Sequence, residues 1–224
     1  MNPISSIEAD NVTRLRRIDT CALSDALDKL QMPGAVMGLV QRSGSGRIAG
    51  LAVTMKVGAG QPPPGPAKHL GCSAIEQSSP DSIIVVEQRS GIDAGCWGGL
   101  LTLGAKVRGV AGVVADGPLR DVDEAMAYGF PVFSRSLTAR TARSRVVELG
   151  TQVPVQIGDA LVMPGDYVLA DRSAVVFVAA AHIQMVLDAA EIIIGKEAAM
   201  AKSILAGTPM GEVMGGHYEH MLAK

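Results

Sequence analysis

The chain of 224 residues carries 48% apolar and 19% charged residues and a formal net charge of −2. This balance excludes a disordered chain, and the mixed signs leave no broad basic surface, so we expect no nucleic-acid partner. Three scattered cysteines exclude a disulfide framework or a zinc ribbon and favour a reducing, cytoplasmic setting. The longest apolar run, 174–181, is shorter than the roughly 20 residues of a membrane span, and residues 1–8 lack a signal-peptide pattern, so we expect no membrane association.

The first predicted element is an amphipathic helix that Asp19 or Thr20 can cap and that Pro33-Gly34 ends. Two strand-like runs follow at 38–41 and 49–57. The proline-rich stretch 58–66 must be an exposed loop, because proline is excluded from helix interiors and central strands.

From residue 80 the pattern alternates between strand and helix. The predicted elements are strands at 82–86, 110–115, 130–133, 153–157 and 175–178, and helices at 98–108, 121–128 and 182–206. The unit 82–115 is strand–helix–strand, which forms a right-handed parallel crossover. We therefore predict one α/β domain over residues 1–224, with a helical tail at about 182–224.

Two loops at the carboxyl ends of neighbouring parallel strands carry the candidate chemistry, because open α/β sheets bind ligands there. One loop enters a helix at Gly98-Gly99-Leu100-Leu101, where glycine allows close backbone approach and free N–H groups favour an anion. The other carries Asp116, the carboxylate-binding fork of Arg120, and Asp121, an oxygen ligand suited to Mg²⁺. Together they predict a site for a small carboxylate, such as an α-keto acid, beside a divalent metal.

The same residues have simpler structural interpretations. Gly98-Gly99 suits a tight turn, and Arg120 suits a surface ion pair of little energetic consequence. Asp121 and Glu124 have the spacing of a capping box, which on spacing alone is favoured over metal binding. Cys96 precedes a helix start, where a thiolate would be stabilised, but a small buried thiol is the favoured interpretation.

A longer pattern joins these residues. Gly99, twenty intervening residues, Arg120-Asp121, two further residues and Glu124 resemble the signature of the RraA-like / 4-hydroxy-4-methyl-2-oxoglutarate (HMG/CHA) aldolase family. The segments 20–27, 109–117, 129–133 and 162–166 also resemble that family, and the resemblance covers about residues 20–205.

The resemblance implies a fold, an assembly and a site. The fold would be a compact αββα sandwich with a swivelling β/α/β-type core, assembled as a homotrimer or as a hexamer of two trimers. The backbone of Gly98–Leu101 and the side chain of Arg120 would hold the pyruvate-like half of a substrate. Asp121 would hold a divalent cation, Mg²⁺ or alternatively Mn²⁺, partly through water. Glu124, or Glu197 reaching the metal site of a neighbouring subunit, would support it from behind.

The chain departs from both branches of the family. The aldolases carry Asp where Gly99 stands, and the RNase E regulators usually follow the equivalent of Glu124 with an acid, where this chain has Ala125. We expect a metal-dependent lyase that releases pyruvate from small α-keto dicarboxylates, by aldol cleavage of 4-hydroxy-4-methyl-2-oxoglutarate or by decarboxylation of oxaloacetate. The alternatives are a non-enzymatic regulator that binds another protein, and a binding protein with a vestigial site.

Overall fold

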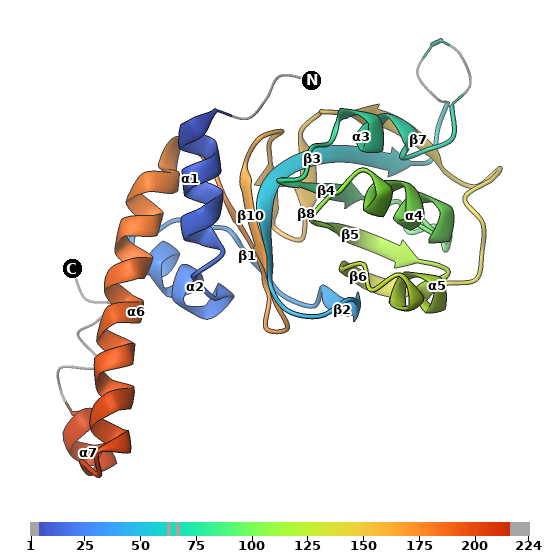
Figure 1. Ribbon diagram of the computed structural model, residues 1–224. Coiled ribbons are helices and arrows are strands. Elements are labelled where there is room, and N and C mark those ends of the chain that lie inside the picture. The colour runs from blue at the N-terminus through green and yellow to red at the C-terminus, as the bar shows by residue number, and fades with distance from the viewer. Residues whose placement is uncertain (1–4, 62–63, 66–67, 216–224) are drawn as a thin grey trace.

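A curved sheet of nine strands organises the chain, with helices on both of its outer sides (Figure 1). The computed structural model describes residues 5–61, 64–65 and 68–215. The helices are α1 (Ser6–Leu15), α2 (Thr20–Lys29), α3 (Cys72–Gln77), α4 (Gly99–Val107), α5 (Val122–Ala127), the 3-10 turn η1 (Ala180–His182), α6 (Ile183–Leu205) and α7 (Met210–Val213). The strands are β1 (Ala35–Val36), β2 (Val40–Ser43), β3 (Ile48–Gly58), β4 (Ser82–Glu87), β5 (Gly112–Leu119), β6 (Val132–Leu137), β7 (Val147–Thr151), β8 (Val155–Ile157), β9 (Ala160–Val162), β10 (Tyr167–Ala170) and β11 (Val175–Val178). The expected α/β fold is confirmed.

The centre of the sheet is parallel. Strands β3, β4, β5 and β6 lie side by side in chain order, and α3, α4 and α5 supply the crossovers between them. Strands β10, β11 and β1 extend one edge in antiparallel fashion, β2 closes the other, and β7 pairs with the end of β3. The predicted β4–α4–β5 crossover is therefore present, with α4 within one residue of its predicted bounds.

Strand β5 is longer than predicted. The prediction ended it at residue 115 because Gly117-Pro118 looks like a turn, whereas pairing with β6 continues through Pro118 and Leu119 after a register shift. Proline fits here because this residue turns its polar backbone atoms away from β6. Its carbonyl accepts from the Cys96 N–H at 2.9 Å, so the N–H that proline lacks is not one that pairs with β6. The extension moves Asp116 from the predicted loop into the strand itself.

Three apolar clusters hold the layers together. One lies between the parallel strands and α3–α5, a second between the sheet and α1, α2 and α6, and a third between the sheet and the β8–β9 hairpin. Burial on α6 is confined to its first half, ending at Ile193, and Leu205 near its end is 88% exposed. No helix in the described ranges is both long and apolar enough to cross a bilayer.

Candidate active site

A cavity of about 800 Å³ opens at the carboxyl ends of the parallel strands. Its wall comes from the segments that follow β3, β4, β5 and β6, together with the start of α4. The polar and glycine lining includes His69, Glu76, Gly95, Gly98, Gly99, Arg120, Asp121, Thr141 and Arg143. Both the position and the size are typical of small-molecule sites in α/β folds, which run to roughly 300–1,000 Å³.

Backbone hydrogen bonds fix the two predicted loops against each other. The Arg120 N–H donates to the Trp97 carbonyl at 3.1 Å, and Trp97 pairs with Leu119 as an isolated parallel bridge. The chain after β4 thus continues beside the end of β5. As a result, Gly98 and Gly99 at the start of α4 face Arg120 and Asp121, as the crossover predicted.

Asp121 is the residue with unusual geometry in this site. Its backbone is left-handed, with φ 57° and ψ 41°, and its side chain makes no capping bond to α5. Its Oδ2 instead accepts from the Gly99 N–H at 3.0 Å and its Oδ1 accepts from Arg120 Nε at 3.2 Å. The capping-box interpretation of Asp121 and Glu124 is therefore wrong, because a left-handed Asp121 turns its carboxylate toward α4.

Two glycines make room for the acidic side chains. A Cβ at Gly98 would lie 2.8 Å from Asp121 Oδ2, and one at Gly99 would overlap the Glu124 carboxylate. The Glu124 side chain therefore fills the space beside position 99, where the resemblance expects an aspartate in aldolases. Gly98 and Gly99 leave room for this close approach, and the tight-turn interpretation does not account for them, because neither has a left-handed φ.

Unused donors surround the Asp121 carboxylate. Helix α4 has no side-chain cap, and in the described part of the chain the N–H groups of Leu100 and Leu101 have no acceptor. Arg120 is 35% exposed, and its terminal nitrogens likewise bond to nothing in the described segments. These groups can together receive one carboxylate.

The same residues fit a hard divalent cation. Asp121 and Glu124 bring two carboxylates next to Gly99. The described residues contain no group of three or more His, Cys, Asp and Glu side chains placed to enclose a metal. Mg²⁺ is commonly held by one or two carboxylates, with water and substrate oxygens as the remaining ligands, so this donor set suits it better than zinc.

Glu197 does not line the cavity of its own chain. It sits on α6 on the far side of the sheet from α4 and α5 (Figure 1). Burial, with Asp19 and Asp25 nearby, raises the pKa of its carboxyl. The structure thus does not bring Glu197 to the cavity of its own chain.

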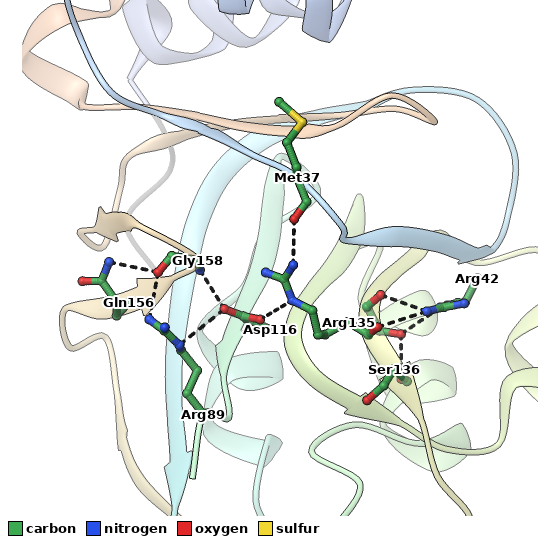
Figure 2. A network of polar contacts seen from close by, with 9 residues as sticks. Met37, Arg42, Arg89, Asp116, Arg135, Ser136, Gln156 and Gly158 are labelled. Carbon is green, nitrogen blue, oxygen red and sulfur yellow. Dashed lines mark hydrogen bonds and ion pairs between the residues drawn. The ribbon is translucent and has the colours of Figure 1, made fainter. Parts of the chain in front are cut away.

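Asp116 belongs to a different network, on the opposite face of β5 (Figure 2). Its carboxylate accepts from Arg135 Nε at 2.8 Å and from the Gly158 N–H at 2.7 Å, with Arg89 Nε at 3.8 Å. Arg135 also donates to the Met37 carbonyl at 2.7 Å. The sequence placed Asp116 and Arg120 on one loop, whereas Asp116 lies inside β5 and Arg120 follows its end, so the two do not share a site.

Some lining residues have no local sequence signal. His69 and Arg143 reach the cavity from the loops after β3 and β6, which no spacing rule connects to Arg120. Cys96 is fully buried, its Sγ donates to the Pro118 carbonyl, and burial raises its pKa to about 12. The favoured interpretation of Cys96 as a buried thiol is confirmed.

Comparisons with known proteins identify the family of this chain. Residues 20–177 match the family described as RraA-like, Aldolase/RraA. A protein of Halalkalibacterium halodurans named "Putative 4-hydroxy-4-methyl-2-oxoglutarate aldolase" is 29% identical over 84% of this chain and 85% of its own. Legionella pneumophila DlpA is 28% identical over 81% of this chain, but the match spans 30% of DlpA.

The fold of the chain is also similar to that of a solved structure. Streptomyces coelicolor RraAS2, described as an unusual member of the RNase ES inhibitor RraA protein family, is 26% identical with a TM-score of 0.75. The match covers 87% of this chain and 97% of RraAS2. The family match extends over most of the 224 residues and contains the whole of the Gly99–Glu124 pattern. The chain therefore belongs to the RraA-like (Aldolase/RraA) family.

Proposed function

We propose that the cavity is the active site of a divalent-metal-dependent lyase that releases pyruvate from small α-keto dicarboxylates. The observation that carries this proposal is the left-handed Asp121, whose carboxylate is held at the start of α4 beside Arg120 instead of capping its own helix. Uncommon backbone conformations in residues other than glycine persist where surrounding contacts enforce them, often at functional sites. The name of the Halalkalibacterium relative supports the same reaction class.

Each residue has a distinct task in this proposal. Arg120 and the N–H groups of Leu100 and Leu101 bind the carboxylate next to the keto group and orient the substrate. Asp121 holds Mg²⁺ or Mn²⁺, directly or through water, and Glu124 supports it from across Gly99. A cation bound there would polarise the C2 carbonyl as a Lewis acid. Arg120 also offsets the negative charge that develops as the C–C bond breaks and the pyruvate enolate forms.

The Asp121 site favours decarboxylation of oxaloacetate over aldol cleavage. Aldol cleavage needs a base that removes a proton from the substrate hydroxyl, whereas a departing carboxylate is already ionised. Position 99 has no side chain to act as that base. The exposed Glu124 carboxylate beside it has the task of supporting the cation in this proposal. Both reactions release pyruvate, so both belong to the proposed activity.

The proposal includes the assembly and setting of the chain. We propose one domain over residues 1–224, assembled as a homotrimer or hexamer in the cytoplasm, without nucleic-acid or membrane partners. Exposed apolar residues on α6, including Ile192 at 57% and Leu205 at 88%, support self-association. Light scattering at micromolar concentration is expected to give a mass of three or six chains, and a stable monomer would contradict this assembly.

The activity is tested by pyruvate release from oxaloacetate with added Mg²⁺, compared with a blank that contains Mg²⁺ alone. We expect release well above the blank, its loss on adding EDTA, and its recovery with excess Mg²⁺. Release that persists unchanged in EDTA would contradict metal dependence. Absence of release from both oxaloacetate and 4-hydroxy-4-methyl-2-oxoglutarate would contradict the lyase proposal.

A protein-binding regulator is the second candidate. The likeness to RraAS2, from a family described as RNase ES inhibitors, supports it, as does Gly99 in place of an acid. This alternative predicts no turnover of either keto acid and no effect of Asp121→Ala on partner binding. The same pyruvate assay therefore separates the two functions.

A further inference from the structure

The loop between β6 and β7 closes one side of the cavity and is firmly anchored. The Gly95 N–H donates to the Arg140 carbonyl at 2.9 Å, and the Val146 N–H donates to the Ala142 carbonyl at 3.0 Å. Ala142 is 8% exposed and packs in the cluster beneath α4. The Arg143 N–H donates to Thr141 Oγ1 at 3.3 Å. The backbone at Arg143 is therefore held in place at the cavity wall.

Three arginines of this loop differ in what they contact. Arg140 pairs with Asp93 at 3.3 Å, and Arg145 donates to the Thr141 carbonyl at 3.3 Å. Arg143 lies on the cavity wall and is exposed, and its guanidinium has no acceptor in the ranges that the structure describes. Arg143 is thus the arginine of this loop that lies on the cavity wall and has no protein partner among the described residues.

The charges around the cavity leave Arg143 unbalanced. Asp121 is paired with Arg120, and Glu76 is paired with Lys68 at 3.1 Å. Neither acid forms an ion pair with Arg143. A ligand with one carboxylate on Arg120 and the α4 amides would therefore leave one cation of the cavity wall without a counter-charge. The second carboxylate of a dicarboxylate ligand would neutralise Arg143.

We propose that Arg143 binds the second carboxylate of the substrate, at the end away from the keto group, and so selects dicarboxylates over monocarboxylates. This inference rests on the proposed function for the placement of the first carboxylate. A guanidinium offers a planar fork that matches a carboxylate in bidentate fashion, and such charge-assisted bonds are among the stronger ones. Arg143 is a specificity-determining residue in this scheme and takes no part in bond cleavage.

The test compares binding of two unreactive keto acids of equal chain length in the presence of Mg²⁺. The probes are 2-oxoglutarate, which has the second carboxylate, and 2-oxopentanoate, which lacks it, and calorimetry measures both dissociation constants. We expect the natural protein to bind 2-oxoglutarate about 10–100-fold more tightly than 2-oxopentanoate. This is the ratio of dissociation constants typical of one hydrogen bond to a charged group. Arg143→Gln should reduce that preference to about two-fold or less, with 2-oxopentanoate binding unchanged. Arg145→Gln, a charge-matched control in the same loop, should keep the full preference.

The outcomes separate this inference from the proposed function. Equal binding of both probes by the natural protein would overturn the role of Arg143 and leave the keto-acid site standing. The same loss of preference in Arg145→Gln would also overturn it, because general charge attraction would then explain the effect. Failure of both probes to bind the natural protein with Mg²⁺ would overturn the proposed function and this inference together.

Discussion

Two Asp–Arg pairs lie at the carboxyl end of β5 and differ in almost every physical respect. Asp116 is 7% exposed, and its oxygens accept from Arg135 and from the Gly158 N–H, with Arg89 close by (Figure 2). Asp121 is 31% exposed and bonds to one backbone N–H and to Nε of the adjacent Arg120. The first pair is satisfied within the protein, and the second keeps free donor and acceptor capacity that faces a cavity.

The difference shows that residue type alone does not mark a site. Buried pairs that are fully hydrogen-bonded tie elements together, and removal of one member leaves an uncompensated charge. The Asp116 pair joins β5 and β6 to the β8–β9 hairpin and to the segment before β2. The Arg120–Asp121 pair has an acid that is 31% exposed, against 7% for Asp116, and so adds less stability, and its geometry calls for a functional explanation.

The largest expected effect is on turnover. Asp121→Ala should lower Mg²⁺-dependent pyruvate release by about 10²–10³-fold or more, because it removes preorganised charge from the reacting centre. Its unfolding midpoint in urea should stay close to that of the natural protein. Full activity in this variant would show that Asp121 does not hold the metal and would remove the distinction between the two pairs.

The matched change on the other face should affect stability instead. Asp116→Ala should lower the free energy of unfolding by about 3 kcal/mol, the low end for a broken buried pair, because Arg135 is 38% exposed. Turnover per folded molecule should be retained. Urea denaturation and the pyruvate assay measure the two quantities on one preparation, and a loss of turnover at unchanged stability would reverse the assignment.

Restoring an acid at position 99 should change the balance between reactions. Gly99→Asp should raise aldol cleavage relative to decarboxylation by about 10²-fold, the low end for a positioned base, because the Glu124 carboxylate must first move aside. Gly99→Asn is the control, since it has the same size and no basic oxygen. Faster aldol cleavage than decarboxylation in the natural protein would instead show that another residue supplies the base.

The smallest effect concerns the buried thiol of Cys96. Burial, with Asp116 as a further cause, raises the pKa of Cys96 to about 12, so the reactive thiolate is scarce at pH 8. A thiol reagent at that pH should modify the exposed Cys21 and spare Cys96, as located by peptide mass spectrometry. Asp121→Ala should leave this protection unchanged, whereas Asp116→Ala should weaken it through lower stability. Rapid labelling of Cys96 in the natural protein would contradict the buried assignment.

The sequence predicted the centre of the fold well. The continuous apolar runs of β4 and β5 and the glycine after α4 placed the crossover and brought Gly98 beside Arg120. The first helix, α1, was missed although Ser5 and Glu8 form its capping box, a signal readable from spacing. The end of β5 was misplaced because Gly117-Pro118 resembles a turn, and only pairing with β6 reveals the strand there.

The details of the site depended on information that spacing does not contain. Asp121 and Glu124 have capping-box spacing, but a positive φ at Asp121 redirects its carboxylate. The face on which Asp116 lies follows from where β5 ends, which was predicted too early. Arg143 reaches the cavity by the packing of a loop distant in the chain, and no local pattern encodes that contact.

The central claim is tested most directly by a crystal structure of the protein soaked with Mg²⁺ and pyruvate. The account predicts the cation at Asp121, bound directly or through one water, with the pyruvate carboxylate on Arg120 and the N–H groups of Leu100 and Leu101. The Asp116 network should be unchanged. Pyruvate or Mg²⁺ bound at Asp116, or an Asp121 carboxylate that keeps only its bonds to Gly99 and Arg120 at saturating Mg²⁺ and pyruvate, would contradict the account.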